Sequence, residues 1–352
     1  MSADIDPHAA LNAYDIGTIN QIAPAGGTAG RTWKVETSTG AYLLRLRGVR
    51  TSGADRLQFD HGLRRHLLDH DVPTAATVPT TDGELWQHLE AGVYELYPFV
   101  EGRAFEPQHL AEVAAAAAAL ARYHAAAATY RPPFSHREPI GQYTALGFSD
   151  AVSDRMDDPH LQANNIETTR TLATTAEQRQ VVDRCLARVQ SMCTTYAGPA
   201  YDHLAGWVIH GDYTPANLLF STAGEVVGIF DLDWALPGAR CRDVADGLYF
   251  FATQSRHIDA ASIWSLTDAA QIDPERCATF LRAYQSVSPL TPGELAAIPL
   301  AFAGRWLSIR LEGMAKVAPE DRFRFFSRDV EEPLAWLDGN WPALQRSVHP
   351  ES

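Results

Sequence analysis

The chain is 352 residues long with a mass of 38.6 kDa, which is enough for two lobes and a sizeable hydrophobic core. Its formal net charge of −14 argues against nucleic acid or an anionic membrane as a main partner, because both carry negative charge themselves. The sequence has no signal peptide, no apolar run of the roughly 18 residues that a membrane span needs, and no metal-binding or disulfide-framework spacing among its cysteines, so we expect a cytoplasmic protein with reduced thiols.

Short strands dominate the first hundred residues. A glycine-containing loop at 24–30 leads into a strand-like run, and a Ser-Thr-Gly turn at 38–40 joins that run to residues 42–47. Turn residues between β-branched and aromatic runs indicate antiparallel strands. Gly26 and Gly27 could let the loop lie close over phosphate groups, although glycine-rich turns are also common in ordinary hairpins.

Two arginines share one face of the strand at 42–47. Alternation places Arg45 and Arg47 on the face opposite Leu44 and Leu46, and we interpret Arg47 as an exposed strand residue. Residues 55–70 then carry apolar side chains at helical spacing, which predicts an amphipathic helix.

The composition becomes helical after residue 107. Twelve of the 18 residues at 111–128 are alanine, which has the highest helix propensity. His124, late in this helix, could reach a catalytic loop, but we interpret it as a core or C-terminal-turn histidine. A further helix is predicted at about 174–197, and helices follow at about 258–268, 274–286, 292–316 and 319–338.

The stretch with the most chemical information is WVIHGDYTPANLLF at 207–220, followed by GEVVGIFDLDWA at 224–235. Each combines apolar, strand-like runs with polar residues at their ends. An unpaired buried carboxylate costs several kcal/mol, so acids placed beside buried strands need a reason. The pattern H-x-D-x-x-x-x-N with an aspartate fourteen residues later matches the proton-accepting and magnesium-binding layout of kinases. The alternative is a hairpin in which Asp and Asn only close turns.

The motif HGDYTPAN with DLD resembles the aminoglycoside phosphotransferase and choline kinase-like family of small-molecule kinases, within the protein-kinase-like superfamily. The resemblance implies an α+β, two-lobe fold. Residues 1–99 would form a small antiparallel-sheet lobe with a hinge at 95–99, and residues 100–345 a larger, mostly helical lobe.

The same resemblance implies roles for individual residues. Asp212 would be the catalytic base, Asn217 and Asp231 would bind magnesium, and Asp233 and His210 are possible helpers. A second set would bind the nucleotide. Its members are the loop glycines Gly26 and Gly27, the phosphate-binding Arg45, its ion-pair partner Asp60 (otherwise a solvated helix residue), and the hinge residues Glu95, Tyr97 and Phe99 through their main chain.

Two arginine-containing groups lie outside this set. In the family an Arg-Asp pair braces the active-site loop, and Arg242 and Asp243 match it. Arg305, Arg310 and Glu312 on a later helix could line a substrate pocket, but we interpret them as surface ion pairs.

The expected activity is ATP- and Mg²⁺-dependent transfer of a phosphoryl group to a hydroxyl of a small polar metabolite. Amino sugars, aminoglycosides, amino alcohols and homoserine are all compatible with the motifs, which belong to the shared phosphate machinery. The alternative is a catalytically silent nucleotide-binding pseudokinase that regulates or binds a partner. Such a module would usually lack a base or metal ligand. The sequence does not predict the oligomeric state.

Overall fold

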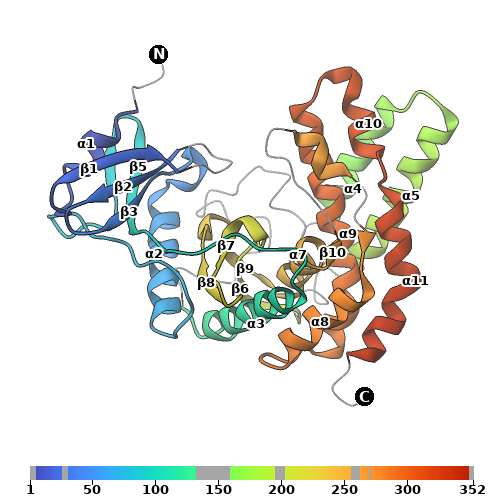
Figure 1. The fold of residues 1–352 in the computed structure, drawn as a ribbon. Helices are drawn as coiled ribbons and strands as arrows, with labels where there is room; N and C mark the ends of the chain where they lie inside the picture. The colour runs from blue at the N-terminus through green and yellow to red at the C-terminus, as the bar shows by residue number, and fades with distance from the viewer. Residues whose placement is uncertain are drawn as a thin grey trace.

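A computed structural model describes residues 5–25, 31–131, 159–194, 203–254, 262–268 and 271–348. A five-stranded antiparallel sheet forms the N-terminal part, in the order β1-β2-β3-β5-β4 (Figure 1). Its strands are β1 (Ile19–Pro24), β2 (Thr32–Thr37), β3 (Ala41–Leu46), β4 (Gln87–Leu89) and β5 (Gly92–Pro98). Two helices accompany this sheet, the short α1 (Pro7–Leu11) and the long α2 (Ala54–Leu68).

The N-terminal sheet has its own small core. Leu44 and Leu46 of β3 are buried with Val35 of β2 and Leu96 of β5, and α1 contributes Leu11 to the same cluster. The start of α1 follows from its sequence, because Asp6 caps the helix and Pro7 occupies its first position.

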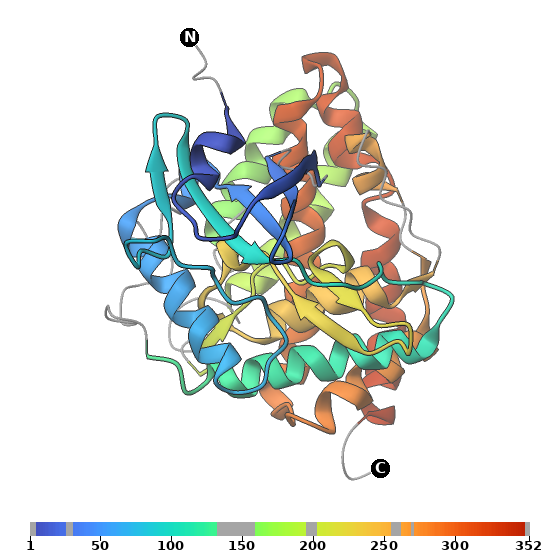
Figure 2. The same cartoon turned by 60° about the vertical axis from the view of Figure 1, so that its left-hand side comes forward.

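The alanine-rich segment forms α3 (Leu110–Ala127), which runs across two antiparallel strand pairs (Figure 1, Figure 2). One pair is β6 (Ala205–Ile209) with β9 (Leu236–Ala239), and the other is the hairpin of β7 (Leu218–Phe220) and β8 (Val226–Ile229), which lies between them in the chain. The small side chains of α3 allow a close approach to this region, and the Tyr213 hydroxyl donates to the backbone oxygen of Ala116 at 2.8 Å. This packing places both strand pairs in the larger hydrophobic core.

Helices make up most of the remaining residues that the structure describes. They are α4 (Pro159–Thr169), α5 (Ala176–Cys193), α7 (Cys241–Phe251), α8 (Pro274–Gln285), α9 (Pro292–Gly313), α10 (Arg322–Ser327) and α11 (Glu331–Ser347). Two short strands, β10 (Thr253–Gln254) and β11 (Gln271–Ile272), pair with each other. Capping boxes begin α5 and α9, where Thr175 pairs with Gln178 and Thr291 with Glu294.

The predicted α+β fold, with a small antiparallel sheet and a larger helical part, is confirmed. The helix predicted at 319–338 is wrong, because the chain forms α10 and α11 with a break at Asp329, whose φ of 51° is left-handed. Of the helix predicted at 258–268, the described residues form only a 3-10 turn, Ile263–Thr267. Among the residues that the structure describes, no helix is long and apolar enough to cross a membrane.

Candidate active site

The loop between β6 and β7, residues 210–217, brings Asp212 and Asn217 together. The Asn217 side-chain Nδ2 donates to the backbone oxygen of Asp212 at 2.8 Å and to its Oδ2 at 3.1 Å. Asn217 therefore closes the loop on itself and orients the Asp212 carboxylate, which stays partly exposed. The Asn217 Oδ1 has no hydrogen bond within the described residues, so it is available to a ligand.

Asp231 is held beside this loop by the neighbouring hairpin. It follows β8 after Phe230, with a left-handed φ of 59°. The backbone N–H of Phe230 donates to the oxygen of Asn217 at 2.9 Å, and His210 Nε2 donates to the oxygen of Phe230 at 2.8 Å. The structure thus brings Asp212, Asn217 and Asp231 to one place, as the motif predicted, and His210 joins the two loops.

Arg45 reaches this group from the N-terminal sheet. Its guanidinium contacts Asp231 Oδ1 at 3.1 Å and both oxygens of Asp233, at 2.9 and 2.7 Å. Burial would raise the pKa of Asp233, but Arg45 and Arg47 outweigh it and hold that pKa below its ordinary value. The pKa of Asp231 is raised by burial and by the neighbouring carboxylates Asp233 and Asp212, which together outweigh the opposing effect of Arg45.

This charge distribution fits a divalent cation. Asp231 and Asn217 supply carboxylate and amide oxygens, the hard donors that Mg²⁺ prefers. Burial is the main reason why the pKa of Asp231 is raised, and the carboxylates Asp233 and Asp212 raise it further. A divalent cation beside Asp231 would favour the charged form of its carboxylate, so the residues present are compatible with magnesium.

A buried aspartate braces the loop from behind. Asp243 on α7 accepts from the backbone N–H groups of His210 at 2.6 Å and Gly211 at 2.9 Å, and from His124 Nε2 at 3.0 Å. Burial opposes its charge, yet these donors lower the pKa of Asp243. Arg242 donates to the oxygen of Gly211 at 3.4 Å. The predicted brace by the Arg-Asp pair and the interpretation of His124 as a core residue are both confirmed.

Gly211 is required by this geometry. Its φ is +80°, and a Cβ there would overlap the carbonyl oxygen of Trp234. Both features exclude a side chain. We expect Gly211→Ala to lower the free energy of unfolding by about 1–3 kcal/mol through backbone strain alone. It should also lower turnover, because it displaces Asp212. Urea unfolding and steady-state kinetics measure the two effects, with Gly53→Ala, at an unobstructed position, as control. Equal behaviour of both variants would contradict this reading.

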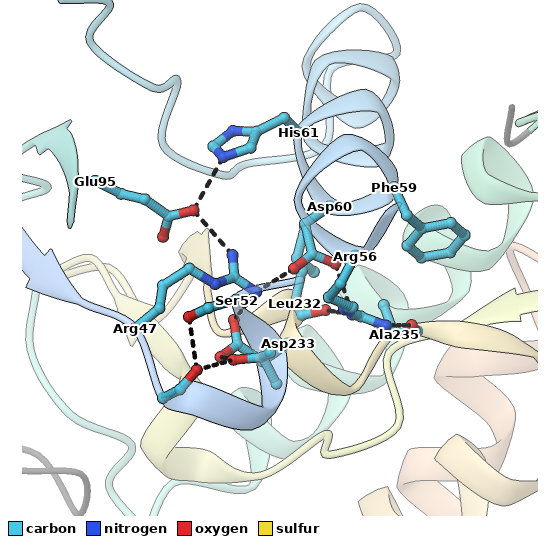
Figure 3. A network of polar contacts seen from close by, with 12 residues as sticks. Arg47, Ser52, Arg56, Phe59, Asp60, His61, Glu95, Leu232, Asp233 and Ala235 are labelled. Carbon is cyan, nitrogen blue, oxygen red and sulfur yellow. Dashed lines mark hydrogen bonds and ion pairs between the residues drawn. The ribbon is translucent and has the colours of Figure 1, made fainter. Parts of the chain in front are cut away.

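Asp60 and Arg45 do not form the predicted ion pair. Asp60 instead pairs with Arg47, and with Arg56 at 2.6 Å (Figure 3). Arg47 also contacts Glu95 Oε1 at 2.9 Å and Asp233 Oδ1 at 3.0 Å. The interpretation of Arg47 as exposed is therefore wrong, since only 2% of it is accessible. Both arginines lie on one strand face as predicted, but α2 and the Asp233 loop cover that face instead of solvent.

The predicted hinge residues have visible roles in the sheet. The Glu95 side chain is fully buried and accepts hydrogen bonds from Arg47, from His61 at 2.9 Å and from the Tyr97 hydroxyl at 2.8 Å. The Phe99 N–H donates to Ala41 at 2.9 Å, so that group serves the sheet and is not open to adenine. Other main-chain contacts to a nucleotide stay a prediction. The predicted phosphate loop with Gly26 and Gly27 lies outside the described residues.

Arg305 of α9 contacts the candidate site, whereas the sequence interpretation preferred a surface ion pair to a place in a pocket. Its Nη2 donates to Asp212 Oδ1 at 2.7 Å, and its Nε lies 3.3 Å from Oδ1 of the fully buried Asp246. It is no surface ion pair, and neither is Arg310, which is buried and donates to the oxygen of Thr267 at 3.0 Å. The sequence did contain a signal for these buried arginines. The helix α9 is apolar on nearly all sides, which indicates that it is buried, and a charged side chain on a buried helix needs a polar partner.

Asp246 makes stability depend on pH. Burial, against the opposing charge of Arg305, raises the pKa of Asp246 to about 7. The folded state then holds this proton where the unfolded state has lost it, so stability falls as pH rises from about 4 to about 7. Between about pH 5 and pH 8 we expect the free energy of unfolding of the wild-type protein to fall by about 2–3 kcal/mol more than that of Asp246→Asn. Urea unfolding across this range tests it, with exposed Asp82→Asn as control. Parallel wild-type and Asp246→Asn curves would contradict it.

Comparison with known proteins decides the family. A model described as "Phosphotransferase enzyme family" matches residues 20–274, which is most of the chain. The chain belongs to this family. It is therefore a phosphotransferase of the kinase type, and the predicted enzyme class is confirmed.

Individual members of the family differ in the substrate that their names give. A protein of Parvibaculum lavamentivorans named homoserine kinase is 26% identical over 338 residues, covering 92% of both chains. Among solved structures, an aminoglycoside phosphotransferase from Alicyclobacillus acidocaldarius has a TM-score of 0.66 at 16% identity, covering 98% of both chains. Amicoumacin kinase, solved with AMP-PNP and Ca²⁺, has a TM-score of 0.62 at 15% identity over 98% of this chain and 96% of its own. These two likenesses show the fold.

Proposed function

We propose that this phosphotransferase moves the γ-phosphoryl group of ATP, with Mg²⁺, to a hydroxyl of a small polar metabolite. The observation that carries the proposal is the meeting of Asp212 and Asn217, in the loop between β6 and β7, with Asp231 after β8, and with Arg45 beside them. Phosphoryl transfer needs positioning and charge neutralisation more than covalent chemistry, and this arrangement offers both. The AMP-PNP and Ca²⁺ bound to amicoumacin kinase support a nucleotide and a divalent cation.

Each residue has a distinct task in this proposal. Asp212, oriented by Asn217, accepts the proton of the attacking hydroxyl. Asn217 and Asp231 hold Mg²⁺, which neutralises phosphate charge when bound. Arg45, which contacts Asp231 and Asp233 in this structure, supplies the positive charge that binds the phosphates. Asp233 holds Arg45 beside Asp231.

The division of the chain belongs to the proposal as well. Residues 1–99, with the hinge at 95–99, would bind the nucleotide, and residues 100–345 would bind the acceptor. The relative named homoserine kinase favours an acceptor of the amino-alcohol or homoserine type.

The pseudokinase alternative has no support in the site. A silent module would be expected to lack the base or a metal ligand, and Asp212, Asn217 and Asp231 are all in place. ADP release with magnesium-ATP against pooled amino sugars, aminoglycosides, amino alcohols, homoserine and free sugars tests the proposal. Release in one pool supports it and identifies the acceptor class. Silence in all pools contradicts transfer to any of these metabolites.

The metal assignment has its own test. We expect Asp231→Ala to weaken magnesium-ATP binding by at least about tenfold, because it removes a charged ligand. Calorimetric titration with and without magnesium measures this loss. Asp268→Ala, at an exposed carboxylate paired with Arg328, is the control. Unchanged binding by the Asp231 variant would remove Asp231 from the metal site.

A further inference from the structure

A guanidinium adjoins the carboxylate that we assign as the base. Arg305 donates through Nη2 to Asp212 Oδ1 at 2.7 Å, and its side chain retains 13% of its accessible surface. Any acceptor hydroxyl that approaches Asp212 must therefore pass close to Arg305. The charge of Arg305 is secure, because Asp246 and Asp212 outweigh the effect of burial and raise the pKa of the guanidinium.

The guanidinium is anchored so that one nitrogen stays open. Asp246 stands behind Nε at 3.3 Å, and the ring centroid of Phe250 lies 5.7 Å from the guanidinium carbon. Nη2 is used by Asp212. Nη1 makes no hydrogen bond or ion pair with any residue in the described part of the chain. Because the planar guanidinium is held at Nε and Nη2, its Nη1 can donate to a ligand in a fixed direction.

The charge beside the base discriminates between acceptors. A cationic amine next to Arg305 would be repelled, whereas a carboxylate would gain a charge-assisted hydrogen bond. Arg is suited to this task because its rigid, planar guanidinium holds the open nitrogen in place and its charge does not depend on pH.

We propose that Arg305 binds a carboxylate of the acceptor, so that the substrate is a small hydroxy acid carrying its carboxylate a few bonds from the reacting hydroxyl. Asp246 acts as a positioning residue that holds the guanidinium toward the acceptor. This inference rests on the proposed function and narrows it, because acceptors with only hydroxyl and amino groups would lack the group that Arg305 binds.

Two acceptors that differ only in the carboxylate provide the test. L-homoserine carries the carboxylate, and 3-aminopropan-1-ol is the same molecule without it. We expect wild-type kcat/KM for homoserine to exceed that for aminopropanol by about 10- to 100-fold, the effect of one charge-assisted hydrogen bond. Arg305→Gln should bring the ratio close to one, and Arg305→Lys should keep part of it.

Controls separate acceptor binding from other effects. Arg324→Gln, at an arginine with 72% of its side chain exposed, should leave the ratio unchanged. Because Arg305→Gln leaves Asp246 buried without its cation, the double variant Arg305→Gln with Asp246→Asn removes both charges together. Thermal melting and magnesium-ATP titration show whether each variant is folded.

The outcomes distinguish this inference from the function it rests on. If Arg305→Gln lowers both rates equally and keeps the ratio, Arg305 only positions Asp212, and the inference is overturned while the kinase function stands. If the wild-type kcat/KM for an acceptor without a carboxylate equals that for homoserine, the inference also fails and the function stands. If no acceptor is phosphorylated although magnesium-ATP binds, both fail.

Discussion

Asp212→Asn is expected to lower kcat by about 10²- to 10⁴-fold, the usual contribution of a positioned general base. The amide keeps the shape of the carboxylate and an oxygen for Arg305, but it cannot accept the hydroxyl proton. Asp212 has no contact with Arg45, so magnesium-ATP binding should stay within about threefold of wild type. Steady-state ADP release at saturating acceptor gives kcat, and calorimetric titration gives the nucleotide affinity.

A matched change elsewhere tests the specificity of that effect. Asp183 on α5 has 57% of its side chain exposed and pairs with Arg170, so Asp183→Asn should leave kcat unchanged. If Asp212→Asn kept turnover within a few-fold of wild type, Asp212 would not be the base. A parallel loss of nucleotide affinity and kcat would instead indicate that the loop had been displaced.

The centre of the site could be predicted because its information is local. Asp212, Asn217 and Asp231 lie within 20 residues of one another, and the hairpin of β7 and β8 has a register that places Leu218 opposite Ile229. Once the apolar runs were identified as strands, the polar residues at their ends had to meet. The spacing of these residues in the sequence was therefore enough to predict that their side chains lie close together.

Contacts between distant segments could not be predicted in the same way. Strand alternation assigns Arg45 and Arg47 to a face, but it does not say which acid each one meets. Asp60 reached Arg47 because α2 lies over that end of β3, while Arg45 extends to the Asp233 loop, 188 residues away. Arg305 is 93 residues from Asp212, and only the packing of α9 brings them together.

The buried charges around Arg47 hold four segments of the protein together. Arg47, directly after β3, contacts Asp60 of α2, Glu95 of β5 and Asp233 after β8 (Figure 3). Burial opposes the charge of Arg47, but the three carboxylates outweigh it and raise its pKa. The pKa of Glu95 is held low against burial by Arg47 and His61. Each charge is stable inside the protein only because of the others.

We therefore expect Arg47→Met to lower the free energy of unfolding by about 3–5 kcal/mol, the cost of removing one partner from a buried ion pair. Asp60 keeps Arg56 and Asp233 keeps Arg45, so Glu95 is the carboxylate that loses its arginine and retains only His61 and the Tyr97 hydroxyl. Adding Glu95→Gln should then restore part of the loss, which a simple packing defect would not allow.

The urea midpoint measures these changes, and Arg65→Met, at a side chain 81% exposed, should shift stability by less than about 0.5 kcal/mol. If Arg47→Met lowered the free energy of unfolding as little as the control does, water would have to reach this network.

Arg47→Met has a second expected consequence, because Arg47 also contacts Asp233. Because Asp233 also binds Arg45, loss of Arg47 should weaken magnesium-ATP binding, and this coupling would connect the stability of the sheet to the phosphate site.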